Sequence, residues 1–136
     1  MALEPKKIDW NKCAWTTLRD KVRYLSFQGS DAVTVTLDEV TPGHVPGSHR
    51  HDYEQLIFIL QGECDFYVDG VPHHLTAGCL MAIPPNVEHC MVAKGEIPVI
   101  DVDIFMPKRI SDRPESRVAE DPSKAVRFGN LFTPSS

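Results

Sequence analysis

The stretch Gly43-His-Val-Pro-Gly-Ser-His-Arg-His-Asp-Tyr-Glu-Gln-Leu-Ile-Phe-Ile-Leu-Gln-Gly62 decides how this chain folds. Within it, His49, His51 and Gln55 are separated by even numbers of residues. Side chains alternate between the two faces of an extended chain, so we expect all three on one face. Two imidazoles and an amide oxygen on one face are three predicted ligands for a single metal ion.

A fourth metal ligand has to come from elsewhere, and His89 is the candidate. It follows the turn Pro84-Pro-Asn-Val-Glu88 and begins an apolar stretch. Imidazole and oxygen ligands suit zinc, nickel, iron or manganese better than a soft thiolate site would. Because Gln55 is neutral, the divalent ion would keep its full +2 charge, which favours anionic or enolisable ligands.

The surrounding sequence predicts an all-β protein. Asp69-Gly70 is typical of a two-residue hairpin turn, which needs a positive φ at both positions. Other Gly and Pro residues separate short stretches of strand-forming residues, and no long amphipathic helix interrupts them. We therefore expect an antiparallel sandwich or barrel, with strands at residues 32–37, 56–60, 63–68, 71–75, 79–83, 89–93 and 99–105. In the first of these, Val33, Val35 and Leu37 alternate with threonines, which predicts one buried face.

A chain of 136 residues is the size of one compact domain. Residues 1–30 hold Trp10 and Trp15 without a clear period, which indicates an N-terminal arm or short strands packed on a larger body. We assign residues 31–106 to the barrel. Residues 107–136 contain four prolines and many charges, so they form either a disordered tail or an extended arm crossing the barrel or a neighbouring subunit. The two terminal segments and an open sheet edge lead us to expect a homodimer.

Composition excludes several classes of function. A net charge of −5 disfavours binding to nucleic acid. No apolar run is long enough to cross a bilayer and the start lacks the apolar stretch of a secretory signal, so we expect a cytoplasmic protein that does not bind membranes. The cysteines form no CxxC pair, and we expect Cys64, Cys79 and Cys90 to be reduced and to pack as small apolar residues.

The predicted ligands resemble the first of two signature motifs of the cupin superfamily. That motif runs Gly, five residues, His-x-His, three residues, a carboxylate, six residues and Gly. Here Gly43, His49, His51, Gln55 and Gly62 keep every spacing, with Gln55 in place of the carboxylate.

The second motif of that superfamily runs Gly, five residues, Pro-x-Gly, two residues, His, three residues and Asn. It is matched by Gly78, Pro84, Asn86, His89 and Ala93. Asn86 replaces the turn glycine, and asparagine also adopts the left-handed conformation, while Ala93 replaces the final asparagine. The resemblance implies a double-stranded β-helix, a jelly-roll-like barrel, that holds one divalent metal ion with the four ligands.

Residues 99–109 form the second informative stretch. Asp101, Asp103 and Phe105 alternate with aliphatic residues, so they share one face of a late strand. Carboxylates in this position either lie outward in water or point inward toward a metal, in which case the aliphatic face packs on a second sheet or a subunit.

This stretch is similar to the end of small pectin-degradation cupins that linearise ring-form unsaturated uronates. The shared pattern is Asp103, Phe105, Pro107 and Arg109. The resemblance implies that Asp103 acts as general acid or base, that Phe105 lines the pocket and that Arg109 pairs with a substrate carboxylate.

We therefore expect an enzyme that uses a divalent metal to act on a small acidic or sugar-like molecule by proton transfer, through tautomerisation, ring opening or lyase chemistry. An iron dioxygenase, a polyketide-type cyclase and a non-catalytic ligand-binding cupin are the alternatives. Tyr53 shares the parity of the ligands, and it either donates a proton to the substrate or fills the mouth of the barrel. We expect His44, His73 and His74 on the surface.

Overall fold

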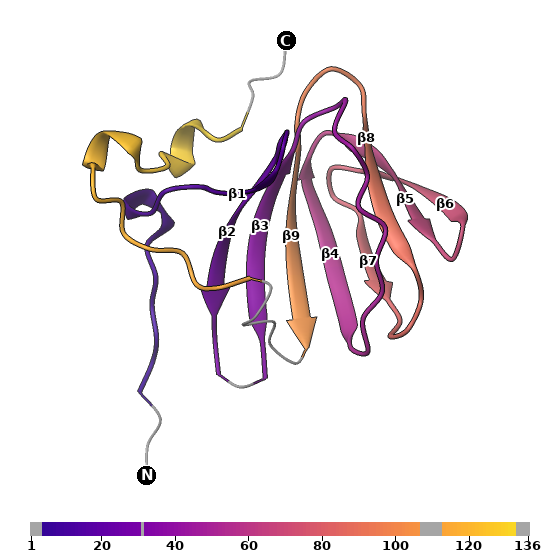
Figure 1. The fold of residues 1–136 in the computed structure, drawn as a ribbon, viewed down its shortest axis with the longest axis horizontal. Coiled ribbons are helices and arrows are strands. Elements are labelled where there is room, and N and C mark those ends of the chain that lie inside the picture. The colour runs from indigo at the N-terminus through magenta and orange to yellow at the C-terminus, as the bar shows by residue number, and fades with distance from the viewer. Residues whose placement is uncertain (1–3, 31, 107–112, 133–136) are drawn as a thin grey trace.

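The computed structural model describes residues 4–30, 32–106 and 113–132. They form two antiparallel sheets (Figure 1), a six-stranded sheet of order β1-β2-β3-β9-β4-β7 and a three-stranded sheet of order β6-β5-β8. The strands are β1 (Thr16–Arg19), β2 (Val22–Gln28), β3 (Thr34–Val40), β4 (Glu54–Gln61), β5 (Glu63–Val68), β6 (Val71–Thr76), β7 (Leu80–Ile83), β8 (His89–Lys94) and β9 (Val99–Met106). Three short 3-10 helices are η1 (Trp10–Lys12), η2 (Pro122–Lys124) and η3 (Phe128–Asn130).

The predicted all-β fold class is confirmed, and the expected strands are present with small shifts at their ends. Residues 63–68 match β5, whereas β4 extends further in both directions than residues 56–60. Asp69 and Gly70 have φ values of 52° and 80°, as the hairpin between β5 and β6 requires. No helix in the described ranges is long and apolar enough to cross a bilayer.

The N-terminal segment contributes to the larger sheet. Of the residues assigned to an arm, β1 and β2 pair with each other, and β2 pairs along its whole length with β3. Of the two possibilities offered for residues 1–30, short strands are what residues 16–28 form. The larger sheet therefore begins well before residue 31.

The described part of the C-terminal segment packs on its own chain, next to the N-terminal segment (Figure 1). The Ala119 N–H donates to the Lys12 carbonyl at 2.9 Å, and the Val126 N–H donates to the Cys13 carbonyl at 2.7 Å. Residues 113–132 are thus an extended arm laid along the chain's own sheet. The homodimer stays a prediction.

Two apolar cores lie on opposite faces of the larger sheet. The first fills the space between the sheets and consists of Val22, Val40, Ile57, Ile59, Cys64, Phe66, Leu75, Ile83, Ala93 and Val99. The second lies on the outer face, where the terminal segments cover it, and consists of Cys13, Leu25, Leu37, Ile100 and Val126. Burial on both faces gives the central strands two sources of hydrophobic stabilisation.

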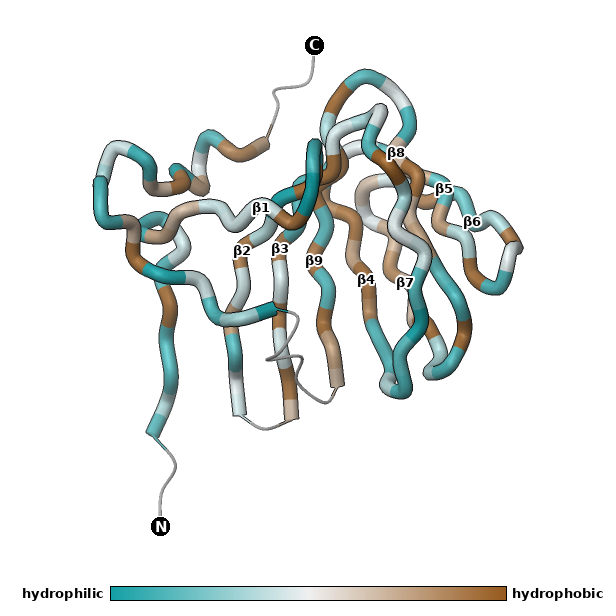
Figure 2. Tube along the Cα trace, in the orientation of Figure 1, coloured by the Kyte–Doolittle hydropathy of each residue, from teal (hydrophilic) through white to brown (hydrophobic). Residues whose placement is uncertain are grey.

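The interior of the barrel is polar at one end. Thr34 and Thr36 are fully buried, so our expectation that only the aliphatic face of residues 32–37 would be buried is wrong. Leu37 packs in the outer core because the terminal segments cover that face, which leaves the threonines pointing inward. Figure 2 shows the same alternation along β9, where hydrophilic positions interrupt hydrophobic ones.

We predict that Ile100→Ala lowers the free energy of unfolding by about 2–5 kcal/mol, because it leaves a cavity in the outer core. Denaturant unfolding monitored by circular dichroism measures this change. Leu80→Ala is the control, since Leu80 is 69% exposed, and it should change stability by about 0.5 kcal/mol at most. An equally small change in Ile100→Ala would contradict a structural role for the terminal segments.

Candidate metal centre and pocket

Three predicted metal ligands converge in the structure. His49, His51 and His89 each offer a ring nitrogen, and these three atoms lie within 4.8 Å of one another. The centroid of the His89 ring is 4.4 Å from that of His49 and 4.8 Å from that of His51. Such a cluster of imidazoles can hold one divalent ion.

The histidines converge for a reason different from the one we expected. The regular strand β4 begins at Glu54, so His49 and His51 lie in the loop before it, and strand alternation does not align them. Instead, the backbones of His49 and His89 exchange N–H···O bonds of 3.1 and 2.9 Å. The Asn86 N–H donates to the His51 carbonyl at 2.7 Å, and Asn86 has the predicted left-handed φ, 67°.

The orientation of each imidazole presents the same nitrogen to the centre of the cluster. In all three histidines, Nδ1 lies 2.8–3.0 Å from the carbonyl oxygen of a residue two positions away. A carbonyl only accepts hydrogen bonds, so Nδ1 carries the proton and Nε2 keeps its lone pair. Backbone carbonyls that fix the tautomer in this way are typical of metal-binding histidines.

Gln55 places its amide oxygen in the same cluster. Its Nε2 donates to Oδ1 of Asp103 at 2.9 Å, which turns Oε1 toward His51. Oε1 and His51 Nε2 are 3.1 Å apart. Because His51 carries its proton on Nδ1, its Nε2 and the Oε1 of Gln55 are both hydrogen-bond acceptors and repel each other. A cation bound between the two atoms removes this repulsion. Two ligands of one ion at bond lengths of about 2.1 Å are separated by about 3.0–3.4 Å, so the four residues fit a divalent metal.

The aspartates of β9 point inward. Asp101 and Asp103 are both buried, and their carboxylate oxygens lie within 4.8 Å of each other and of Asp38 on β3. This arrangement decides between the two orientations that the sequence left open, because the opposite face of β9 packs in the outer core through Ile100. Burial, followed by the charges of Asp103 and Asp38, raises the pKa of Asp101 well above its ordinary value.

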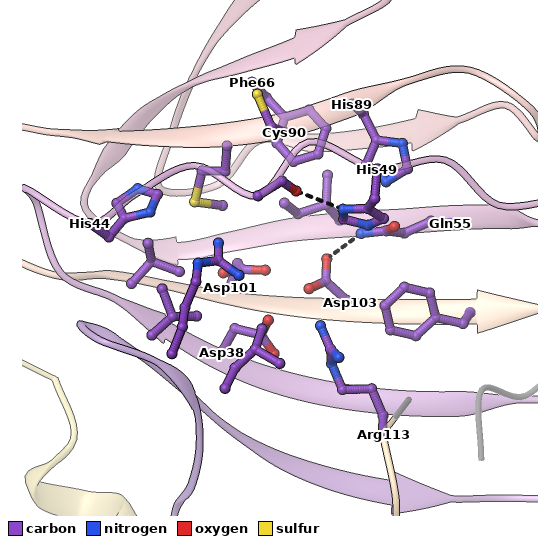
Figure 3. A pocket seen from close by; sticks show the side chains of 18 residues that line it. Asp38, His44, His49, Gln55, Phe66, His89, Cys90, Asp101, Asp103 and Arg113 are labelled. Atoms are coloured by element: carbon purple, nitrogen blue, oxygen red, sulfur yellow. Dashed lines mark hydrogen bonds between the residues drawn. The ribbon is translucent and has the colours of Figure 1, made fainter. Parts of the chain in front are cut away.

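One pocket joins the histidines to the aspartates (Figure 3). It is open to solvent, and Figure 3 shows the side chains of both groups that face it. His49, Gln55 and His89 line it together with Asp103 and Phe105. The pocket therefore brings three of the four predicted ligands, the predicted acid or base and the predicted aromatic wall to one place.

The remaining predicted site residues have different outcomes. Tyr53 stacks on His51 with the ring centroids 4.1 Å apart and an angle of 4° between the rings, a position that leaves both of its proposed roles open. Arg109 lies outside the described residues. His74 is on the surface as predicted, where it faces Asp65 at 3.1 Å.

Our expectation that His44 is exposed is wrong. It is buried in the pocket wall, where Nε2 accepts a hydrogen bond of 3.1 Å from the Ala93 N–H. Burial lowers the pKa of His44. This role could not be read from its position in a Pro- and Gly-rich loop.

Two cationic side chains of the pocket were also missed. Arg19 and Arg113 both line it, although they are far from the metal-binding motifs in the sequence. Nothing in the local pattern of residues distinguishes them from solvated arginines, because long-range packing brings their segments to the pocket.

Comparisons with known proteins agree with this architecture. Residues 36–105 match the family described as the cupin domain. Over 58 residues, which are 43% of this chain and 38% of the relative, the sequence is 40% identical to dimethylsulfoniopropionate lyase DddW of Ruegeria pomeroyi. The match thus spans well under half the length of that lyase.

Two solved structures share the fold at low sequence identity. KdgF from Halomonas sp. has a TM-score of 0.64 and 20% identity, with 70% of this chain and 86% of that chain covered. The polyketide cyclase RemF from Streptomyces resistomycificus has a TM-score of 0.66 and 20% identity, with 88% of this chain and 90% of that chain covered.

We predict that His89→Ala and His51→Ala each abolish binding of one equivalent of divalent metal, because each removes an Nε2 ligand. Elemental analysis after dialysis against zinc, nickel, iron or manganese measures the bound metal, and circular dichroism checks that the variants are folded. His73→Ala, on the exposed face of β6, is the matched control. Unchanged metal content in either ligand variant would refute the site.

We also predict that Asp101→Asn stabilises the metal-free protein more at about pH 7 than at about pH 4. The raised pKa of Asp101 means that the unfolded chain loses this proton at lower pH than the folded chain, so the unfolding free energy falls as pH rises above 3.8. Asparagine does not ionise, so the unfolding free energy of the variant does not fall in this way as the pH rises. Chemical denaturation at both pH values measures the difference, and an equal effect at both would contradict the prediction.

Proposed function

The chain belongs to the cupin family, and we propose that it is a divalent-metal-dependent enzyme that transfers a proton on a small carboxylic acid, by tautomerisation, ring opening or elimination. The observation that carries the proposal is the contact between Asp103 and Gln55. This hydrogen bond of 2.9 Å places a buried carboxylate directly beside a predicted metal ligand.

The predicted ligands determine what the centre does to a substrate. A bound divalent ion supplies a Lewis acid that polarises a hydroxyl or carbonyl oxygen. The three histidines and Gln55 are all neutral and so leave the positive charge of the ion uncompensated. An oxygen atom that gains negative charge during the reaction is therefore stabilised in this pocket.

The aspartates hold and move the proton. Oδ1 of Asp103 accepts from the Gln55 amide, which orients the carboxylate that we assign to proton exchange with the substrate. Burial and the charge of Asp103 raise the pKa of Asp101 well above its ordinary value, so Asp101 is the carboxyl group that favours the protonated form. This arrangement supports Asp103 as an ionised general base next to a neutral acid.

Two substrate classes follow from the similarities of the chain. The Asp103-to-Arg109 pattern resembles that of cupins that linearise unsaturated uronates, and the sequence match is to a lyase for dimethylsulfoniopropionate. Both names denote carboxylates, and ring opening and elimination are both reactions in which a proton is transferred. Neither requires a redox cofactor.

We predict that Asp103→Asn retains the metal but lowers kcat by about 10²–10⁴, the usual contribution of a general base. Turnover of an unsaturated uronate and of dimethylsulfoniopropionate is measured with the metal-loaded protein. Asp69→Asn is the control, because Asp69 is exposed in the hairpin turn and asparagine tolerates its positive φ.

The same assay distinguishes the alternatives. Oxygen consumption during turnover would favour a dioxygenase, and saturable binding without product would favour a ligand-binding cupin. Full activity of Asp103→Asn, or of protein stripped of metal, would overturn the proposal.

A further inference from the structure

We propose that Arg113, with Arg19 beside it, forms the site that recognises the carboxylate of the substrate. The inference deepens the proposed function, on which it rests, because it makes an acidic group a requirement for binding in the pocket. It assigns this role to an arginine of the C-terminal arm that belongs to neither metal-binding motif.

Two cationic side chains can attract an anion to this pocket, which Asp38, Asp101 and Asp103 also line. Among the described residues that line it, Arg19 and Arg113 are the only lysines or arginines. The two guanidinium groups are close enough to affect each other: burial and then the charge of Arg113 lower the pKa of Arg19, and Asp38 opposes them. Asp38 already supplies part of the compensating negative charge, and a substrate carboxylate near the guanidinium groups would add to it.

Arg113 is held in place by buried side chains of the barrel. Its carbonyl accepts hydrogen bonds from Ser26 Oγ at 3.0 Å and from the Gln28 side-chain amide. Oε1 of Gln28 in turn accepts from Thr34 Oγ1 at 2.6 Å. All three of these side chains are buried in the barrel: Ser26, Gln28 and Thr34. They therefore hold the start of the C-terminal arm at a fixed position against the barrel.

A second fixed point lies just beyond, at Ser116. Its Oγ accepts from the Ser26 N–H at 2.7 Å, and its N–H donates to the Ser26 carbonyl at 3.1 Å. These bonds occupy the part of β2 that extends beyond its pairing with β1. Arg113 is therefore a positioned residue of the pocket wall, unlike an arginine on a loose tail.

The side chain of Arg113 reaches the reacting end of the pocket. Its guanidinium lies over the ring of Tyr24, 5.0 Å from the centroid, which supports the planar group from one side. Figure 3 shows it pointing toward Asp103, which lies between Arg113 and Gln55. A substrate carboxylate at Arg113 thus places the neighbouring carbon atoms next to Asp103. The planar fork of arginine matches the two oxygens of a carboxylate.

Arg19 supports the same site from the other terminal segment. Its Nε donates to the Val45 carbonyl at 2.9 Å. A Cβ atom at Gly47 would lie 3.0–3.2 Å from the guanidinium atoms of Arg19, so the missing side chain of Gly47 gives this group its room. The loop that carries His49 is thereby packed directly against Arg19.

The test compares a carboxylate with its neutral analogue. Propanoate and propanamide are titrated into metal-loaded and metal-free protein, and the dissociation constants are measured by NMR. We expect Arg113→Gln to weaken propanoate binding at least about tenfold in both forms and to leave propanamide unchanged. Arg19→Gln should weaken propanoate less, and Arg113→Lys should retain part of the affinity. Arg117→Gln, an exposed arginine on the same arm, should have no effect.

Two outcomes overturn the inference. If Arg113→Gln binds propanoate as well as or better than the wild type, the arginine serves only to neutralise Asp38 and Asp103. If Arg109→Gln, and not Arg113→Gln, weakens propanoate, the carboxylate site is at Arg109. If the proposed function fails instead, the wild type still discriminates between the probes through Arg113 but shows no metal-dependent turnover.

Discussion

The position of β9 between β3 and β4 is the constraint on which the rest of the structure depends. Its side chains alternate, so one face carries Asp101, Asp103 and Phe105, and the other carries aliphatic residues. A slip of one residue in its register would exchange the two faces. The terminal segments prevent this, because they bury Ile100 in the outer core. The carboxylates are thereby kept in the interior, where their chemistry differs from that in water.

The interior position also explains the electrostatics of the pocket. Burial favours the neutral form of Asp101, whereas Asp103 receives a hydrogen bond from Gln55. The amide nitrogen of Gln55 thus donates to a carboxylate, while the amide oxygen faces the histidine cluster. A glutamate at this position would repel Asp103, so the glutamine and the buried aspartate are compatible as a pair.

Much of the candidate site could be predicted from residue spacing. His49, His51, Gln55 and His89 lie together as the two motifs indicate, and Asn86 has the left-handed conformation expected of a residue that replaces glycine. The reason we gave for their convergence was wrong, because backbone hydrogen bonds between two loops align the histidines. Spacing indicates which residues meet, and it does not reveal which contacts bring them together.

Residue patterns alone predicted the strands from residue 32 onward, the hairpin turn at Asp69-Gly70 and the identity of the candidate ligands, because these depend on alternation, on φ preferences and on chemical type within a few residues. The packed structure was needed to show which face of β9 is inside, that His44 is buried, and that Arg19 and Arg113 reach the pocket. Each of these depends on how segments far apart in the chain cover one another. Such coverage leaves no local pattern in the sequence, since an arginine in a pocket wall and an arginine in water have the same neighbours along the chain.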